Sequence, residues 1–295
     1  MSFNLEGDGV RIANAGRKRV FYDEENEDGA KDVTVSDVKL EIIPRELVDD
    51  ETTHSVFYLS AKAGAGKSVL VSQLLNMYRR GGKKKIFVFA PVKEEIFGDV
   101  VYPDINDIIG YSSKYQNALE KYNEAKIKFK YLKKTLKDDP LKLCRLEMRL
   151  AKMRPDMSTK GLLEFKVNPA EYFGNGVVVM DDYLDTTVCG AQKLLLMMRD
   201  HIITTGRKQN ISVLLCHHKT TDGKATGKVL TEVTNLVLFR KSTPCSREYV
   251  LKRYLGVSSA TYAEIEKRFV ENKDRWIMFD KDHGYMMSPH WASVL

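Results

Sequence analysis

The feature that most constrains the fold is a nine-residue segment, Ser60 to Ser68, which reads Ser-Ala-Lys-Ala-Gly-Ala-Gly-Lys-Ser. An apolar run, Val56 to Leu59, precedes it, and Val69-Leu70-Val71 follows it. This order predicts a strand, a glycine-rich loop and then a helix whose N-terminus faces the loop. Such a loop offers backbone N–H groups, a helix N-terminus and an ammonium group to a chain of phosphates. The pattern therefore indicates a nucleotide-binding loop in an α/β fold.

Each position of this segment suits one part of a nucleoside triphosphate. Gly64 and Gly66 allow the backbone to approach the phosphates closely, whereas Ala61 stands where the first glycine of such loops is usual. Lys67 would neutralise the β- and γ-phosphates, and the Ser68 hydroxyl would coordinate Mg²⁺. We therefore expect ATP and Mg²⁺ as cofactors. The expected nucleotide-binding residues are Ala61, Lys62, Ala63, Gly64, Ala65, Gly66, Lys67, Ser68 and Val69.

Two carboxylates follow a second apolar run. The segment Val177 to Met180 is typical of a buried central strand and leads directly into Asp181 and Asp182. An ATPase needs one acid that holds Mg²⁺ and one that orients and deprotonates the attacking water. We assign Asp181 to the metal and Asp182 to the general base. The expected metal-binding residues are then Ser68 and Asp181. The expected catalytic residues include Lys67 and Asp182.

The rest of the chain alternates between apolar strands and amphipathic helices, which predicts an α/β fold with a mostly parallel sheet flanked by helices on both faces. The expected strands are Lys39 to Ile43, Ser55 to Leu59, Lys85 to Ala90, Val177 to Met180, Ile211 to Cys216 and Leu236 to Phe239. The expected helices are Lys67 to Arg80, Val188 to Thr205, Arg247 to Leu255 and Ala260 to Asn272. A terminal hairpin is expected from Trp276 to Asp280 and Tyr285 to Met287, an edge hairpin from Val10 to Tyr22, and an acidic loop from Asp23 to Asp28.

Charge is concentrated in one segment. Residues 114–154 contain 13 Lys and Arg against 5 Asp and Glu, a net charge of +8 in a chain whose total is +7. Apolar residues recur there in heptad register on both sides of Pro140, at Tyr115, Ala118, Tyr122, Ala125, Phe129, Leu132, Leu136, Leu143, Leu146, Leu150 and Met153. This pattern predicts a basic helical hairpin with a turn at the proline. Its lysines suit a nucleic-acid backbone, an acidic protein or simply a solvated face.

These patterns predict three parts. Residues 1–50 form an N-terminal extension that contributes some edge strands, and residues 51–112 and 156–295 form the core of a P-loop ATPase. Residues 113–155 are the basic helical hairpin, inserted into that core.

Composition excludes several classes of protein. Hydrophobic residues make up 43% of the 295, yet no apolar run approaches the length of a membrane span, so we expect none. Met1 to Gly9 lacks the pattern of a signal peptide. Cys144, Cys189, Cys216 and Cys245 form no Cys-x-x-Cys pair, which fits reduced thiols rather than disulfides or a zinc site. We expect a soluble protein in a reducing compartment.

A third element, Thr204 to Asn210, contains Gly206-Arg207 and runs into the apolar strand Ile211 to Cys216, which ends in His217 and His218. With this element the chain resembles the genome-packaging ATPases of large double-stranded DNA viruses, which are P-loop ring translocases of the FtsK and HerA type. The resemblance covers Ser55 to about Arg240. It rests on Ala61 to Ser68, Val177 to Asp182, Gly206-Arg207 and His217-His218, in that order.

The resemblance implies further roles and partners. Proteins of this family place a polar residue, often Gln, at the end of that strand to sense the γ-phosphate, and here His218 or His217 stands in its place. Arg207 is the implied finger that reaches the nucleotide of a neighbouring subunit and acts as a catalytic residue. The implied function is ATP-driven translocation of double-stranded DNA into a capsid by a homo-oligomeric ring. Capsid or membrane-vertex proteins are the implied further partners, and the host cytoplasm, at a viral factory, or the virion is the implied location.

Two other interpretations stay open. The first is a helicase of superfamily 1 type, because Ala61 to Ser68 also fits its Ala-x-x-Gly-x-Gly-Lys form. Such enzymes need a second core domain, and the 113 residues after Asp182 leave little room for one. The second is a nucleotide-gated adaptor, in which the helical hairpin is the functional part and ATP only orders it.

Overall fold

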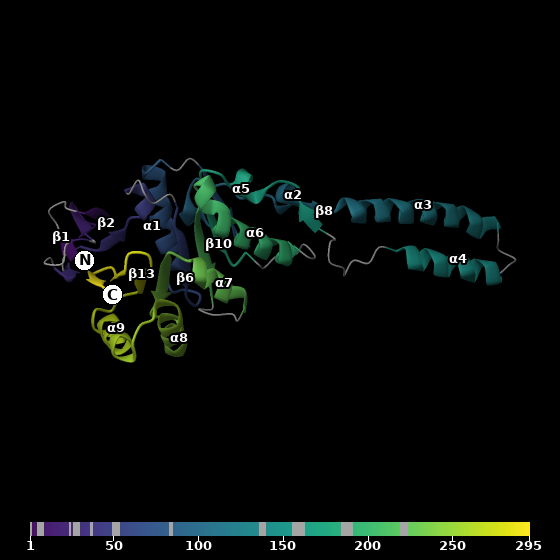
Figure 1. Ribbon diagram of the computed structural model, residues 1–295. Helices are drawn as coiled ribbons and strands as arrows, with labels where there is room; N and C mark the ends of the chain where they lie inside the picture. Colours follow the sequence, from purple (N-terminus) through teal and green to yellow (C-terminus); the bar gives the residue numbers. More distant parts are fainter. Residues whose placement is uncertain are drawn as a thin grey trace. The chain divides into compact units, whose positions relative to one another are not determined.

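The computed structural model of the chain describes residues 2–4, 9–23, 25, 30–35, 38–48, 54–82, 85–135, 140–154, 163–183, 191–218 and 224–295. The chain divides into two compact units. The first comprises residues 1–103, 169–185 and 197–295, and the second comprises residues 104–168 and 186–196. Their helices and strands are labelled in Figure 1.

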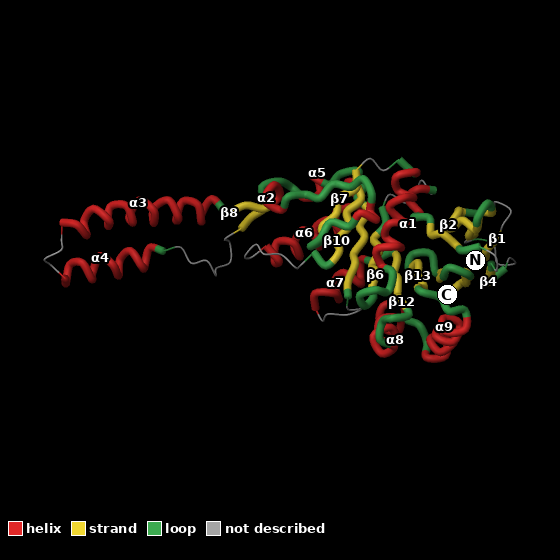
Figure 2. The backbone as a smooth tube through the Cα atoms, turned by 180° about the vertical axis from the view of Figure 1, so that it is seen from behind, coloured by secondary structure: helices red, strands yellow, loops and turns green. Residues whose placement is uncertain are grey.

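A nine-stranded mixed sheet runs through the described part of the first unit (Figure 2). Its order is β4 (Asp32–Thr34), β15 (Trp291–Val294), β14 (Tyr285–Met287), β13 (Trp276–Asp280), β12 (Asn235–Phe239), β6 (Val56–Ser60), β11 (Ser212–His217), β10 (Gly176–Asp181) and β7 (Lys85–Phe89). Strands β12, β6, β11, β10 and β7 are parallel, while β13, β14, β15 and β4 are antiparallel. The α/β class is as predicted, but only one half of the sheet is parallel. Short turns join β13, β14 and β15, and such turns can connect only antiparallel neighbours.

The parallel strands are the best predicted elements. Strands β6, β7, β10, β11 and β12 each begin and end within one residue of the predicted strand. All their residues are buried except Lys85 at the start of β7 and His217 at the end of β11. Short apolar runs rich in Val, Leu and Phe form strands buried on both faces in this way. The carboxyl ends of these strands lie at one edge of the sheet.

Helices cover both faces of the sheet. Helix α1 (Lys67–Arg80) and residues 197–205 of α6 (Ala191–Thr205) lie on opposite faces (Figures 1 and 2). The predicted bounds of α1 are confirmed, whereas residues 188–190, predicted to start α6, lie outside the described residues. The other helices of this unit are α5 (Pro169–Tyr172), α7 (Lys224–Glu232), α8 (Pro244–Leu255) and α9 (Ser259–Glu271), with 3₁₀ turns η1 (Arg45–Leu47), η2 (Glu95–Phe97) and η3 (Gly206–Gln209).

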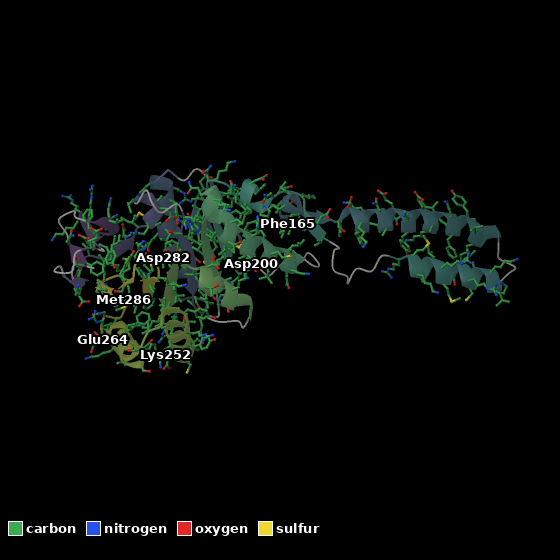
Figure 3. All side chains as sticks on the ribbon, viewed as in Figure 1. Phe165, Asp200, Lys252, Glu264, Asp282 and Met286 are labelled. Carbon is green, nitrogen blue, oxygen red and sulfur yellow. The ribbon has the colours of Figure 1, made fainter. Side chains whose placement is uncertain are left out.

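Helices α8 and α9 are joined by a buried arginine. The Arg247 guanidinium donates to both carboxylate oxygens of Glu266, at 2.8 and 2.6 Å. Figure 3 shows the side chains of these two helices and labels Lys252 of α8 and Glu264 of α9. The same guanidinium donates to the carbonyl of Arg240 at 3.0 Å. Bidentate arginine pairs have well-defined geometry. Arg247 therefore holds the loop that follows β12 at the edge of the sheet.

A second sheet of four antiparallel strands is formed by β1 (Ser2–Asn4), β3 (Lys18–Asp23), β2 (Val10–Ala15) and β5 (Leu40–Ile42), in that order. The hairpin predicted at Val10 to Tyr22 forms, but it lies in the middle of this sheet, so its prediction as an edge hairpin was wrong. Ile12 and Tyr22 are at most 1% exposed and pack into the same apolar cluster as β6. Because burial keeps water from the outer backbone groups of the hairpin, these groups form hydrogen bonds with β1 and β5 instead. Of the acidic loop predicted from Asp23 to Asp28, residues 24 and 26–28 lie outside the described residues.

The second unit contains α2 (Ile105–Ile108), β8 (Ile109–Tyr111), α3 (Ser113–Thr135), α4 (Pro140–Met153) and β9 (Leu163–Phe165). Helices α3 and α4 contact each other, and Lys133 Nζ lies 3.8 Å from Glu147 Oε1. The half-buried residues of the predicted stripe are Tyr115, Ala118, Tyr122, Ala125, Phe129, Leu143, Leu146 and Leu150. Leu132 and Met153, near helix ends, are exposed. Residues 136–139, where the turn was predicted, lie outside the described residues, and that the pair is an insertion stays a prediction.

In the described part of the chain no helix combines the length and the apolar character of a membrane span. Cys144 and Cys245 are exposed free thiols and Cys216 is a buried one. Cys189 lies outside the described residues.

Candidate nucleotide site

The glycine-rich loop has the backbone conformation that its two glycines predict. Strand β6 ends at Ser60, and α1 begins at Lys67 after a loop in which Gly64 has φ +69° and Gly66 has φ +102°. A side chain would strain the backbone at both positions, although the space around Gly66 is open. Ala61 is not among the described residues with positive φ, and its N–H donates to the His217 carbonyl at 3.0 Å. An alanine therefore fits where such loops usually have their first glycine.

The start of α1 presents free donors to a ligand. The earliest backbone hydrogen bond into this helix runs from Leu70 N–H to Gly66 C=O at 3.2 Å. The N–H groups of Lys67, Ser68 and Val69 precede that bond and have no acceptor within the helix. Together with the positive end of the helix dipole they favour an anion. Both Ser68 and Val69 line a pocket of about 400 Å³ at this point.

The two aspartates reach the same pocket from the next strands of the sheet. Strand β10 pairs with β11, which pairs with β6, so the ends of all three strands lie side by side. Asp181 is the last residue of β10 and is only 8% exposed, and Asp182 follows it with φ +45°. Asp181 Oδ1 is buried and has no hydrogen-bond partner among the described residues. A buried carboxylate oxygen without a donor fits a metal ion such as Mg²⁺.

Burial also shifts the titration of this carboxyl. The pKa of Asp181 is raised from 3.8 to about 6, chiefly because burial disfavours the charged form. Attraction to Lys67 opposes this effect, whereas repulsion from Asp182 and Glu94 adds to the rise in pKa. A bound cation would relieve both the burial cost and the repulsion. Groups perturbed in this way gather at functional sites.

A histidine links the general-base candidate to the lysine. His218 Nε2 lies 2.6 Å from Asp182 Oδ2, and His218 Nδ1 lies 3.3 Å from Lys67 Nζ. Because an ammonium group only donates, Nδ1 accepts, and the remaining proton on Nε2 is donated to Asp182. Asp182, His218 and Lys67 thus form one hydrogen-bonded chain. His217 instead stacks on Tyr58, with ring centroids 5.1 Å apart, so His218 is the histidine in the pocket.

The pocket assembles nearly all the residues that the sequence analysis assigned to it. Its lining comprises Lys62, Ala63, Gly64, Ala65, Gly66, Lys67, Ser68, Val69, Glu94, Asp181, Asp182 and His218. Ala61 is fully buried behind the loop and is not part of the lining. The functional roles assigned to these residues stay predictions, because geometry alone does not test them.

Two residues of the site were missed by the sequence analysis. Glu94 lies beyond the end of β7, and its backbone N–H donates a hydrogen bond to the Tyr102 hydroxyl oxygen at 3.0 Å. Lys241 follows β12, and its ammonium donates to the Gly64 carbonyl at 2.9 Å. Both follow predicted parallel strands, so charged residues at strand ends were the signal that could have identified them.

Arg207 does not join this pocket. It is exposed in η3, ahead of the first residue of β11, whereas the pocket lies beyond the last residue of that strand. Six strand residues separate them by roughly 17–20 Å. Arg199 is 3% exposed and pairs with Asp200 at 2.6 Å, while Arg240 is exposed at the pocket's edge of the sheet. Arg207 can act on a nucleotide only from a neighbouring subunit, and that role stays a prediction.

No protein-family model and no curated protein matches the chain. Among solved structures, the genome packaging NTPase B204 from Sulfolobus turreted icosahedral virus 2 with ATP-γS is 11% identical, with a TM-score of 0.39 over 80% of this chain and 97% of that one. VirB4 of Thermoanaerobacter pseudethanolicus is 14% identical, with a TM-score of 0.43 over 100% and 97% of the two chains. The cytoplasmic domain of the type VII secretion ATPase EccC of Thermomonospora curvata is 12% identical, with a TM-score of 0.41 over 97% of this chain and 28% of that one.

These similar structures include a viral genome-packaging NTPase, the class of protein that the sequence resembles. All three TM-scores are below 0.5, so the similarity says nothing about the chemistry of this chain.

Proposed function

We propose that this chain binds and hydrolyses ATP with Mg²⁺ in the pocket between the glycine-rich loop and the two aspartates. The observation that carries this proposal is the buried Oδ1 of Asp181, which receives no hydrogen bond from any described residue and lies beside a loop rich in donors. The loop suits a phosphate chain, and the carboxylate suits the cation that accompanies it. Neither feature is explained by the packing of the sheet.

Each group has a distinct task in this proposal. Lys67 and the N–H groups at the start of α1 hold the phosphates, and Ser68 and Asp181 hold Mg²⁺. The metal ion would neutralise charge on the transferred phosphoryl group. Asp182 orients the attacking water and accepts its proton. His218 donates to Asp182 and contacts Lys67, so it is placed to report whether a γ-phosphate engages that lysine.

The coupled process that we propose is translocation of double-stranded DNA by a homo-oligomeric ring, with genome packaging into a capsid as its purpose. Support comes from the sequence resemblance to packaging ATPases and from the charge of +8 on residues 114–154. Most side chains of α3 and α4 are exposed, so this charge is accessible to a polyanion. Arg207 completes the site of the adjacent subunit.

ATP turnover measured with and without duplex DNA tests the proposal. We expect Mg²⁺-dependent hydrolysis that duplex DNA stimulates, and loss of both in Lys67→Ala. Mass measurement with a nonhydrolysable ATP analogue and DNA should show a ring of several subunits. A chain that hydrolyses ATP but stays monomeric and ignores DNA would be an ATPase of another kind.

The nucleotide-gated adaptor remains a second candidate because α3 and α4 expose apolar side chains among their lysines. Ile127 is 59% exposed, Tyr131 69% and Leu141 73%. Such residues suit a protein surface more than a DNA backbone. An adaptor would show slow turnover that DNA does not change.

A further inference from the structure

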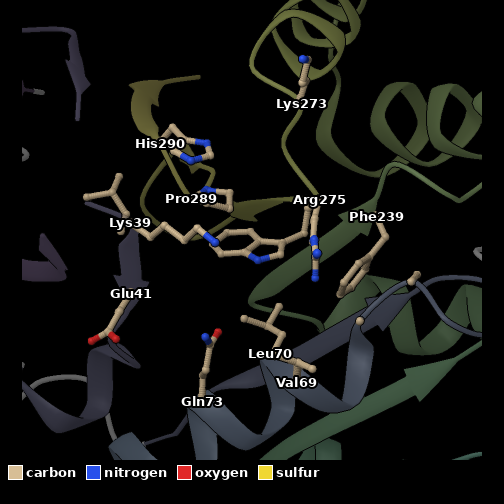
Figure 4. Close-up of a pocket in the computed structure, with 14 residues that line it drawn as sticks. Lys39, Glu41, Val69, Leu70, Gln73, Phe239, Lys273, Arg275, Pro289 and His290 are labelled. Atoms are coloured by element: carbon tan, nitrogen blue, oxygen red, sulfur yellow. The ribbon is translucent and has the colours of Figure 1, made fainter. Parts of the chain in front are cut away.

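A second pocket lies directly beside the pocket lined by the glycine-rich loop, Asp181, Asp182 and His218, which we call the phosphate pocket. It has a volume of about 250 Å³ and shares Ala65, Gly66 and Val69 with the phosphate pocket (Figure 4). Any ligand held by the N–H groups at the start of α1 would therefore lie at the mouth of this second pocket. We call it the aromatic pocket, after Phe239 and Trp276 in its lining.

The floor of the aromatic pocket is apolar. Leu70 of α1 is 3% exposed, Phe239 of β12 is 1% exposed and Trp276 of β13 is 7% exposed. Phe239 and Trp276 are direct partners across β12 and β13, so the pairing of the strands places both aromatic residues at this edge. A planar ring could bury one of its faces against such a floor.

The rim carries a few polar groups that point inward. Gln73, one turn after Val69 on α1, and Arg275, which precedes β13, both direct their side chains into the pocket, as does Lys39 (Figure 4). Lys273 and Glu41 point away from it (Figure 4). An amide can donate and accept at once, which matches the amino group and ring nitrogen of adenine. A guanidinium can stack on the face of a base.

One rim residue is held in place by a buried acid. His290 Nδ1 lies 2.6 Å from Asp274 Oδ1, and Asp274 is 1% exposed. The second oxygen of Asp274 accepts the Trp291 indole N–H at 2.9 Å. His290 is thus a polar group held in place on the wall of the pocket.

We infer that the aromatic pocket binds the base and ribose of the nucleotide whose phosphates occupy the phosphate pocket, and that Gln73 and Arg275 select adenine. This inference rests on the proposed function. The α-phosphate would lie at the Val69 N–H, where the two pockets meet. At about 250 Å³ the aromatic pocket is smaller than the roughly 300–1,000 Å³ typical of drug-sized ligands, which suits one nucleoside. The alternative occupant is a further phosphate, drawn by Lys39, Arg275 and His290.

Binding of two ligands by the full-length chain distinguishes these occupants. Mg·ATP has a nucleoside, and Mg·tripolyphosphate has only the phosphates. Gln73→Ala and Arg275→Ala remove exposed side chains, so the fold should be retained. Calorimetry should show ATP affinity about 5–30-fold weaker in each variant, the loss expected for one hydrogen bond or stacking contact, and tripolyphosphate affinity within about twofold of wild type. Asn76→Ala, an exposed change one turn further along α1 and outside both pockets, is the matched control and should alter neither.

Competition between ATP and GTP adds a second readout. The wild type should prefer ATP, and the preference should fall in Gln73→Ala, because the amide that reads the adenine edge is absent. Equal weakening of ATP and tripolyphosphate in both variants would show that the pocket takes a phosphate and would overturn the inference. So would unchanged binding of both ligands.

The proposed function fails in a different way. Lys67→Ala should abolish binding of both ligands, since both use the glycine-rich loop. If that variant binds ATP and tripolyphosphate as the wild type does, the phosphate pocket itself is misassigned. If Lys67→Ala loses both while Gln73→Ala and Arg275→Ala behave as wild type, only the inference about the aromatic pocket is wrong.

Discussion

At the scale of single residues, the site depends on carboxylates and cations that the fold brings to one edge of the sheet. Asp181, Asp182 and Lys67 come from β10, the residue after it, and the start of α1. His218 bridges Lys67 and Asp182. Removing one member of such a chain leaves its partners without their hydrogen bonds, so single substitutions should have separable effects.

Lys67→Ala and Asp182→Asn should fail at different steps. Lys67→Ala should lose ATP binding, because the phosphates lose their flexible cation. Asp182→Asn should still bind ATP but turn over about 10²–10⁴-fold more slowly, since an amide does not accept the proton of the attacking water. Equilibrium binding of a fluorescent ATP analogue and steady-state phosphate release measure the two effects. If Asp182→Asn keeps wild-type turnover, another residue is the base.

Asp181→Asn should change how stability depends on pH. The folded-state pKa of Asp181, about 6, lies above its ordinary 3.8, so the folded protein binds this proton more tightly than the unfolded chain. Ionisation of Asp181 therefore lowers the free energy of unfolding. This loss is absent below about pH 4, grows between about pH 4 and pH 6, and is constant above about pH 6. Without Mg²⁺, Asp181→Asn should gain stability relative to wild type across this window, by at most about 3 kcal/mol.

Thermal unfolding at pH 4.5 and pH 7.5 measures this change. Adding Mg²⁺ and an ATP analogue should stabilise the wild type but not the variant. Asp282→Asn, in the turn after β13 and exposed, is the matched control and should show no such pH dependence. If the difference in unfolding temperature between Asp181→Asn and wild type is the same at both pH values, burial does not raise the pKa of this carboxyl.

Among the secondary-structure elements, α3 and α4 present a charged surface that contributes no residue to the pocket at the glycine-rich loop. The two helices contact each other, their stripe residues are mostly half-buried, and the described lysines are exposed. A helix pair held together mainly by its own stripe can be altered without disturbing the sheet of the first unit. Binding and hydrolysis should therefore respond differently to changes here.

Reversing the charge of α3 should weaken DNA binding alone. A triple change of Lys126, Lys130 and Lys134 to Glu should lower duplex affinity and flatten its dependence on salt, because fewer counterions are released. Basal ATP turnover without DNA should stay near wild type. The same three residues changed to Arg keep the charge and serve as the control. Unchanged DNA affinity across a salt series would direct attention to a protein partner for these helices.

In the whole molecule, the fold of one chain does not bring all the residues assigned to the reaction into one pocket. Arg207 and the phosphate pocket lie at opposite ends of β11. Arg207 can reach a nucleotide only if subunits pack with this end of one sheet against the phosphate pocket of the next subunit. Oligomerisation would then be a requirement of hydrolysis and not only of DNA movement.

Mixing two inactive variants tests this arrangement. Arg207→Ala should bind ATP normally but hydrolyse it poorly, and Lys67→Ala should not bind it. Mixed rings should regain part of the activity, at interfaces where an intact Arg207 meets an intact loop. If rings of both variants form and stay inactive, Arg207 does not act between subunits, and Arg240, exposed at the pocket's edge of the sheet, becomes the next candidate.

Local patterns in the sequence were sufficient for the parallel strands, for α1 and for the conformation of the loop. The reason is that apolar runs, glycines and helix periodicity act over a few residues, so Gly66 and the helix from Lys67 to Arg80 are specified by their own neighbourhood. The ends of β10 and β11 were also predictable, because parallel strands bring their carboxyl ends to one edge. These features located Lys67, Ser68, Asp181, Asp182 and one of two adjacent histidines.

Features that depend on contacts between distant segments became known from the three-dimensional fold. It selected His218 over His217, because strand alternation and pairing turn one ring toward Lys67 and the other toward Tyr58. It added Glu94 and Lys241 to the site, and it assembled the aromatic pocket from Gln73, Phe239 and Trp276. Local sequence sets the backbone conformation that each segment prefers, whereas a pocket is lined by side chains that become neighbours only when the strands pair into the sheet.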